Sequence, residues 1–261
     1  MNLEGSFTTI EIGQDEGVAW LTLCRAEKLN SFTDVMHSEI REVLSRIQQS
    51  ADVRCLVITG AGRGFSAGQD LADLDMSALG DVVEKNYNPL LRTITSLNIP
   101  VIASVNGVAA GAAANLALAC DIVLAARSAK FIQPFSQLGL VPDGGGSWTL
   151  PRLVGLARAT ALCMTGEPVS AEKAEQWGMI WRCVDDDQLQ EETAELAHRL
   201  SKQATTGLAF TKQLLRLSAT NTLDQQLNLE RDFQQAASKT DDFAEGVDAF
   251  LNKRKPRFTG R

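Results

Sequence analysis

The sequence predicts an α/β fold, and three observations support this. Short runs rich in apolar and β-branched residues recur as buried strands do, at 18–24, 54–60, 101–105, 121–126 and 179–184. Helical patterns lie between these runs, which is typical of sheets covered by helices on both faces. After residue 184 only helical patterns follow. We therefore expect an α/β core followed by an all-helical region.

The predicted helices fall into two groups. The clearest helix of the core covers residues 31–49, where an apolar stripe recurs at helical spacing and is formed by Phe32, Val35, Met36, Ile40, Val43, Leu44 and Ile47. The last part of the chain holds four successive helical patterns, at 189–202, 206–218, 222–238 and 241–254. Residues 72–90 carry no readable signature.

The composition is that of an ordinary globular protein, with 44% hydrophobic and 22% charged residues. The net charge of −7 disfavours a general binder of nucleic acid or of anionic membranes. Residues 101–120 are uncharged and reach the length of a membrane helix, but Asn106, Asn115 and two glycines favour a strand, a turn and a buried helix. We therefore expect no nucleic-acid partner and no membrane segment.

The cysteines and the N-terminus bear on the compartment. The five cysteines are odd in number and scattered, with no Cys-x-x-Cys pair, which argues against a disulfide framework and a zinc site. The acidic N-terminus lacks the basic region of a secretory signal. Both features favour the cytoplasm.

Two short motifs and two histidines suggest other activities, and we reject them. "GFSAG" would make Ser66 the nucleophile of a hydrolase, but the only later histidine, His198, lies within a helical pattern. "GAGRGF" lacks the third glycine of a dinucleotide fingerprint, because Phe65 stands there. His37 and His198 are predicted to be boundary residues of amphipathic helices, so neither metal catalysis nor histidine-based chemistry is expected.

Three loops of small residues remain, at 64–71, 106–115 and 138–148. Glycine and alanine let a ligand approach main-chain N–H groups, and two such groups directed at one oxygen form an oxyanion hole. Asp143, between an apolar stretch and three glycines, would carry the proton beside a stabilised enolate or alkoxide. Two other interpretations stay open: the loops are tight turns of a packed sheet, and Asp143 caps the helix that begins after the glycines.

The chain resembles the crotonase (enoyl-CoA hydratase/isomerase) superfamily over essentially its whole length. The motifs that carry this resemblance are "AEKLNSF", "GRGFSAGQDL", "PVIASVNGVAAGA", "CDIVLAARSAKF", "LGLVPDGGGSWTLPRLVG" and "AEQWGMIWRCVDDD". The resemblance implies a crotonase-like spiral of ββα units with an acyl-CoA site over residues 1–200, and a C-terminal helical trimerisation region over 201–261. It also implies a homotrimer or a hexamer.

The resemblance further implies an acyl-CoA thioester as substrate, whose oxygen accepts from the backbone N–H groups of Ala67 and Ala112, with Gly111 adjacent. The implied pocket is lined by Ser66, Gly68, Gln69, Asp70, Asn115, Phe135, Leu140 and Trp148. The candidates for coenzyme A binding are Lys28, Lys253 and Lys255. Coenzyme A is part of the substrate, so we expect no separate cofactor and no metal.

The departures from the hydratases of this superfamily indicate the reaction. The two glutamates that hold and deprotonate water in hydratases fall on Asn115 and Phe135, and neither side chain can act as a base. Asp143 matches the aspartate that several isomerases of the superfamily use. We expect Phe135, Leu138, Leu140 and Val141 to desolvate this carboxylate and to raise its pKa above about 3.9.

Within the superfamily the chain is most similar to the enzymes that isomerise ring-1,2-epoxyphenylacetyl-CoA in phenylacetate degradation, through "AGRGFSAGQDL", "FSQLGLVPD", "WGMIW" and "NTLDQQLNLERD". The resemblance thus implies an acyl-CoA isomerase that also moves a double bond between positions 3 and 2 of an enoyl-CoA. One alternative is an enoyl-CoA hydratase, or an aroyl-CoA hydrolase or dehalogenase-like enzyme, that uses Asp143 differently. Another is an inactive relative that binds acyl-CoA or RNA.

Overall fold

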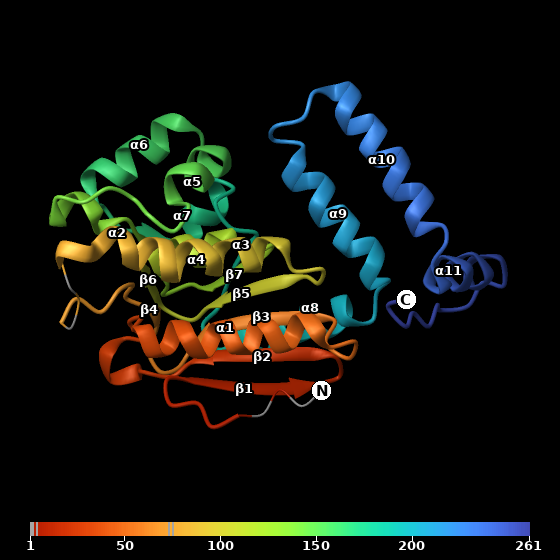
Figure 1. Cartoon of the computed structure of the whole chain (residues 1–261), viewed down its shortest axis with the longest axis horizontal. Coiled ribbons are helices and arrows are strands. Elements are labelled where there is room, and N and C mark those ends of the chain that lie inside the picture. The colour runs from red at the N-terminus through yellow and green to blue at the C-terminus, as the bar shows by residue number, and fades with distance from the viewer. Residues whose placement is uncertain (1–2, 4, 73, 75) are drawn as a thin grey trace.

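Two β-sheets form the centre of the molecule (Figure 1). The computed structural model describes residues 3, 5–72, 74 and 76–261, so that two positions of the 72–90 segment, Asp73 and Asp75, lie outside the described residues. The larger sheet has the order β1 (Ile10–Asp15), β2 (Val18–Leu23), β3 (Cys55–Gly60), β5 (Val101–Val105), β7 (Ile122–Ala126) and β10 (Arg182–Val184). The smaller sheet has the order β4 (Gly64–Ser66), β6 (Val108–Ala110), β8 (Lys130–Ile132) and β9 (Val169–Ser170).

The chain alternates between the two sheets. Strands β3, β5 and β7 of the larger sheet are each followed directly by a strand of the smaller one, β4, β6 and β8. Neighbouring strands along this path pair in parallel in both sheets, while β1 with β2 and β8 with β9 are antiparallel. The result is a spiral of ββα units, which confirms the predicted fold class. It also brings the segments that follow β4 and β6 to the same edge of the smaller sheet.

Helices surround the sheets. Those of the first part are α1 (Asp34–Gln49), α2 (Leu79–Val82), α3 (Asn88–Ser96), α4 (Ala112–Ala119), α5 (Gly146–Val154), α6 (Leu156–Thr165) and α7 (Ala171–Gln176). Single-turn helices cover Ala26–Lys28, Met76–Ala78 and Pro134–Leu138, and Val83–Tyr87 forms one π-helical turn. The last four are α8 (Leu189–Ser201), α9 (Thr205–Leu217), α10 (Leu223–Ala237) and α11 (Asp241–Leu251). Helix α8 packs on the larger sheet, whereas α10 and α11 extend away from it (Figure 1).

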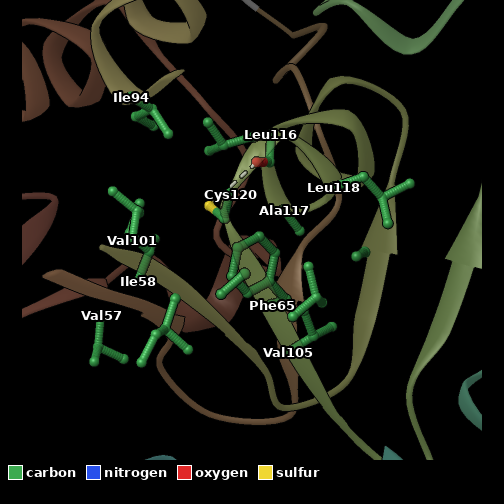
Figure 2. Packing of buried hydrophobic residues seen from close by; sticks show 14 of the residues in the cluster. Val57, Ile58, Phe65, Ile94, Val101, Val105, Leu116, Ala117, Leu118 and Cys120 are labelled. Carbon is green, nitrogen blue, oxygen red and sulfur yellow. Dashed lines mark hydrogen bonds between the residues drawn. The ribbon is translucent and has the colours of Figure 1, made fainter. Parts of the chain in front are cut away.

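The core lies between the two sheets and α4. All eight residues of α4 are buried, so this helix is apolar all round because protein surrounds it. Figure 2 shows Phe65 of β4 in the middle of this cluster, with side chains of β3, β5 and α4 around it. The uncharged stretch 101–120 is therefore β5, β6 and α4, as predicted. Within the described part of the chain, no helix is long and apolar enough to span a membrane.

Some expectations need correction. The run 179–184 contributes only Arg182–Val184 to a strand, because the residues before it form a turn closed by the bond from Met179 N to Ala174 O at 2.8 Å. Val35, assigned to the buried stripe of α1, is 52% exposed. His37, predicted to lie at the boundary of the same helix, is only 1% exposed.

Candidate active site

The three loops of small residues converge on Ala112. A Cβ added to Gly68 would lie 2.8 Å from Ala110 O and 3.8 Å from Ala112 N. A Cβ added to Gly144 would lie 3.6 Å from Ala112 Cα. Gly68 has a φ of +90° and Gly144 a φ of +52°, so the backbone conformation favours glycine at both positions, and at Gly68 the close approach to Ala110 O requires it as well. The segments after β4 and β6 and the loop that carries Asp143 thus form one site.

Ala112 presents a main-chain donor at this point. It is the first residue of α4, and the first amides of a helix have no acceptor within the helix. The preceding amide, that of Gly111, is already bound to Ile132 O at 2.9 Å. The Ala112 N–H has no acceptor among the described residues, and the dipole of α4 favours negative charge beside it. This geometry agrees with the predicted role of Ala112.

Ala67 does not fit its predicted role. Its N–H donates to Leu29 O at 2.9 Å and is therefore already satisfied. Two residues further on, Gln69 forms a parallel bridge with Phe32, whose N–H donates to Gly68 O and whose carbonyl accepts from Asp70 N. In this pattern the N–H of Gln69 itself points away from Phe32, and it has no acceptor in the described residues. The available donor in this loop is thus at Gln69.

The side chain of Gln69 is held from two sides. Tyr87, in the π-helical turn, donates its hydroxyl to Gln69 Oε1 at 2.7 Å, and Gln69 Nε2 donates to Asp70 O at 3.2 Å. Tyr87 is 2% exposed, and burial together with the nearby charge of Asp143 raises its pKa well above 10. The phenol therefore stays protonated and keeps its hydrogen bond to Gln69. Its ring packs edge-on against His37 at 4.6 Å between ring centroids.

Asp143 is the acidic group of the site. Its Oδ1 is buried and has no hydrogen-bond partner, and burial raises the pKa of this carboxyl to about 6. The alternative role as a helix cap is contradicted, because the N-cap of α5 is Gly145 and no side chain caps that helix. A desolvated carboxyl with a pKa close to neutrality is the arrangement expected of a proton carrier.

The residues expected to bury this carboxyl do so only in part. Phe135 is 7% exposed, whereas Leu138 and Val141 are 54% and 79% exposed. The expectation that Leu138 and Val141 shield the Asp143 carboxyl from water is therefore wrong within a single chain. Leu140 and Trp148 are partly exposed as well, and the Trp148 ring lies under the Arg152 guanidinium at 4.0 Å. The glycine run after Asp143 packs directly against α4, and the Asp143 Oδ1 atom at its start is buried.

The two positions at which hydratases carry glutamates are buried and hold no carboxylate. Asn115, on α4, is 1% exposed and donates from Nδ2 to Asp143 O at 2.8 Å. Gln133 donates in turn from Nε2 to Asn115 Oδ1 at 2.8 Å. Phe135 has its ring end 3.6 Å from the place a Cβ on Gly111 would take. The predicted absence of a second base is therefore consistent with the geometry.

Two further pocket candidates have structural partners. Ser66 is fully buried, donates its hydroxyl to Asn30 O at 2.7 Å and accepts from Gly68 N, so it neither lines the pocket nor resembles a nucleophile. Asp70 pairs with Arg25 at 3.0 Å, and the Ala72 N–H and Arg25 lower its pKa. The contacts of Ser66 and Asp70 hold the segment on either side of Gln69, whose N–H has no acceptor among the described residues.

The basic candidates for coenzyme A lie in two separate places. Lys28 is exposed and belongs to the segment that pairs with the Gln69 loop, next to Leu29. Lys253 and Lys255 follow α11 on the opposite side of the molecule from α2 and α4 (Figure 1). A single chain therefore brings only Lys28 to the site.

The sequence did not reveal three residues that shape the site. Asn30 donates to three carbonyl groups of the 61–65 segment, Tyr87 holds Gln69, and Gln133 holds Asn115. The one available signal was that Tyr87 is the single tyrosine of the chain. Asn30 and Gln133 act through contacts distant in sequence, which no local pattern shows.

Comparisons with known proteins show the family of the chain. The chain matches the Enoyl-CoA hydratase/isomerase family over residues 13–261. It is 53% identical over 253 residues to the 1,2-epoxyphenylacetyl-CoA isomerase of Escherichia coli (strain K12), covering 95% of this chain and 97% of that protein. It is 43% identical over 258 residues to a probable enoyl-CoA hydratase of Rhodobacter capsulatus, covering 98% and 100%.

Solved structures show the same relationship. The crystal structure of an enoyl-CoA hydratase from Bacillus anthracis superimposes with a TM-score of 0.93 at 30% sequence identity, covering 97% of this chain and 100% of that one. The family predicted from the sequence motifs is thus confirmed by sequence and by fold. The protein belongs to the enoyl-CoA hydratase/isomerase family.

Proposed function

We propose that the protein is an acyl-CoA isomerase that converts ring-1,2-epoxyphenylacetyl-CoA to its ring-expanded oxepin isomer. The observation that carries this proposal is the half-buried Asp143 carboxyl, whose Oδ1 is buried without a partner and whose pKa burial raises to about 6, in a site whose hydratase positions hold Asn115 and Phe135. The similarity to an isomerase of this substrate at 53% identity supports the choice of acyl group.

In the proposed mechanism, the N–H groups of Gln69 and Ala112 donate to the thioester oxygen. They hold the enolate that forms when a proton leaves the carbon beside the thioester, and such donors each contribute about 10²–10³ in rate. Asp143 takes a proton at one carbon of the acyl chain and returns it at another. The same machinery would move a double bond from position 3 to position 2 of an enoyl-CoA, a reaction that needs a single shuttling base.

Water addition is disfavoured by this site. A hydratase needs a base that deprotonates water beside a group that holds it, whereas an amide and a phenyl ring occupy the two positions here. Ring expansion of the epoxide needs orientation and polarisation, and we expect it to depend on Asp143 less strongly than the double-bond shift does.

We further propose a trimer or a pair of trimers, in the cytoplasm. The last three helices expose large apolar side chains, which supports self-association: Leu215, Leu223, Leu227, Phe243, Val247, Phe250 and Leu251. In such an assembly, Lys253 and Lys255 would approach the coenzyme A of a neighbouring subunit. The five free thiols fit a reducing compartment.

The test incubates the purified protein with three substrates, separates the products by liquid chromatography and identifies them by mass spectrometry, because isomers share one mass and are told apart by their retention. We expect conversion of the ring epoxide of phenylacetyl-CoA and of a 3-enoyl-CoA to isomers of unchanged mass. With crotonyl-CoA we expect no gain of 18 Da, the mass of one water. Rapid hydration of crotonyl-CoA without isomerisation of the other two would contradict the proposal in favour of a hydratase, and tight binding without turnover would favour an inactive relative.

A further inference from the structure

We propose that Asn115 and Gln133 form a positioning pair that holds the loop of Asp143 in its working geometry. The inference rests on the proposed function and deepens it, because it gives a task to the residue that stands where a hydratase has a glutamate. Neither residue needs to touch the substrate for this task.

The hydrogen bonds of the pair have one consistent direction. Asp143 O can only accept, so the amide nitrogen of Asn115 must face it, as the bond of 2.8 Å shows. Asn115 Oδ1 then faces Gln133, which must donate from Nε2, also at 2.8 Å. Gln133 thereby fixes which way the Asn115 amide is turned, and Asn115 fixes the carbonyl of Asp143.

Packing adds to this constraint. A Cβ on Gly146 would lie 2.3 Å from Asn115 Nδ2, and one on Gly144 would lie 3.4 Å from Asn115 Cβ. The glycine run therefore lies directly on the Asn115 side chain. Asp143 O also accepts from Gly146 N at 2.9 Å, so two donors hold this peptide group. Fixing the peptide fixes the direction in which Cβ and the carboxyl leave the main chain.

The cost of the arrangement points to function rather than stability. When Nε2 of Gln133 donates to Asn115, its Oε1 is left buried without a partner. A buried acceptor without a donor destabilises the folded state, so the hydrogen bond to Asn115 forms although it leaves Gln133 Oε1 unsatisfied. Gln133 is only 4% exposed, so solvent does not satisfy that oxygen either. Orienting Asn115 explains why a glutamine stands there.

The test compares Gln133→Leu with the matched control Gln137→Leu. Gln137 lies in the single-turn helix Pro134–Leu138, whose N-cap is Gln133. Its side chain is exposed and makes no hydrogen bond to Asn115. With a 3-enoyl-CoA, we expect Gln133→Leu to lower kcat about 10- to 50-fold with KM within two-fold, while Gln137→Leu keeps kcat within two-fold. The melting temperature of Gln133→Leu should stay close to that of the wild type, because one buried acceptor without a donor, Gln133 Oε1, is exchanged for another, Asn115 Oδ1. This result separates loss of positioning from loss of folding.

A second readout does not depend on turnover. The titration of the Asp143 carboxyl, followed by ¹³C NMR, should shift to lower pH in Gln133→Leu as the freed loop exposes the group to water. Asn115→Leu, which cannot donate to Asp143 O, should lower kcat as Gln133→Leu does. Wild-type kcat together with an unshifted titration in Gln133→Leu would overturn the inference. A wild-type protein that isomerises none of the substrates would instead overturn the proposed function. The NMR comparison of Gln133→Leu with the wild type would still test the positioning role of Asn115 and Gln133.

Discussion

Two aspartates of this protein, Asp143 and Asp242, have buried carboxyl oxygens in opposite surroundings. Asp242, at the start of α11, is 2% exposed and accepts from Thr259 N at 2.6 Å and from Gly260 N at 2.8 Å, which fastens the C-terminal tail. The Oδ1 atom of Asp143 is buried with no partner at all. Proteins normally satisfy buried polar groups, so the unpartnered oxygen supports the proposed role of Asp143 as a proton carrier.

The difference teaches how a fold separates stability from chemistry. The carboxylate of Asp242 accepts hydrogen bonds from the C-terminal tail, and these bonds hold the tail in place. At Asp143 the surroundings, the glycine run and α4, offer main-chain packing but no hydrogen-bond donor to Oδ1, which supports the proposed role of this carboxyl as a proton carrier. Four substitutions can break or sharpen this contrast.

The largest effect is expected from Asp143→Asn. An amide cannot accept a proton from the substrate, so kcat for the double-bond shift should fall about 10³-fold or more. The folded protein should be more stable, since its pKa of about 6 makes the charged form of Asp143 unfavourable in the folded state. Chemical denaturation at pH 8 should show a gain of about 2 kcal/mol.

The sign of this gain gives a control. The folded state binds the proton of Asp143 more tightly than the unfolded chain does, so wild-type stability falls as pH rises from about 4 through 6. The variant should therefore match the wild type near pH 4 and exceed it at pH 8. Isomerase activity close to wild type in Asp143→Asn would refute the assigned role.

Asp242→Ala should produce the opposite result. It leaves the amides of Thr259 and Gly260 without their acceptor and releases the tail, so we expect the free energy of unfolding to drop by about 3 kcal/mol. The kcat of the protein that remains folded should stay within two-fold, because Asp242 lies on α11, away from the site (Figure 1). Urea denaturation and kcat measured below the transition check both halves. A large loss of kcat with unchanged stability in Asp242→Ala would contradict the structural role given to Asp242.

His37 is a smaller exception of the same kind, since neither of its ring nitrogens has a partner. Burial, with the charge of Arg41, lowers its pKa to about 4. The unfolded chain takes up this proton first, so the wild type loses stability as pH falls from 6.5 to 4. His37→Phe, packed between Phe32 and Tyr87, should gain about 1 kcal/mol at pH 7.

The gain in His37→Phe should grow on acidification, because phenylalanine has no proton to bind. Melting temperatures between pH 4 and pH 8 measure this. A variant less stable than wild type at every pH would show that the histidine ring has a partner in solution.

The smallest effect is expected from Lys28→Ala. An exposed lysine near a phosphate-bearing ligand contributes a screened attraction, so KM for the acyl-CoA should rise only two- to five-fold with kcat unchanged. Raising the ionic strength should shrink this difference. Equal KM values for variant and wild type at low salt would remove Lys28 from the coenzyme A site.

The fold was largely predictable because its long strands and helices carry local patterns. The apolar runs that form β2, β3, β5 and β7 can be recognised as strands from the sequence alone. Strands β4 and β6 have three residues each, which is too short for a recognisable hydrophobic pattern. Their existence depends on pairing with each other across more than 40 intervening residues.

The site was predictable to the level of loops but not of atoms. Asp143 stood out as a carboxylate between an apolar stretch and three glycines, and the family motifs pointed to Ala112 as a main-chain donor. The choice between Ala67 and Gln69 as donor depends on the pairing of that segment with residues 29–32, where Leu29 takes one amide and Phe32 leaves the other free. The burial of His37 and the bond from Gln133 to Asn115 likewise arise from contacts distant in sequence.

The most direct measurement is the titration of the Asp143 carboxyl in the wild-type protein, with ¹³C-labelled aspartate and Asp143→Asn to assign the signal. Uncompensated burial predicts a midpoint near 6, two pH units above that of an ordinary aspartate. A midpoint near 4 would show that water or an unseen donor satisfies this carboxylate, and it would contradict the distinction between the two aspartates.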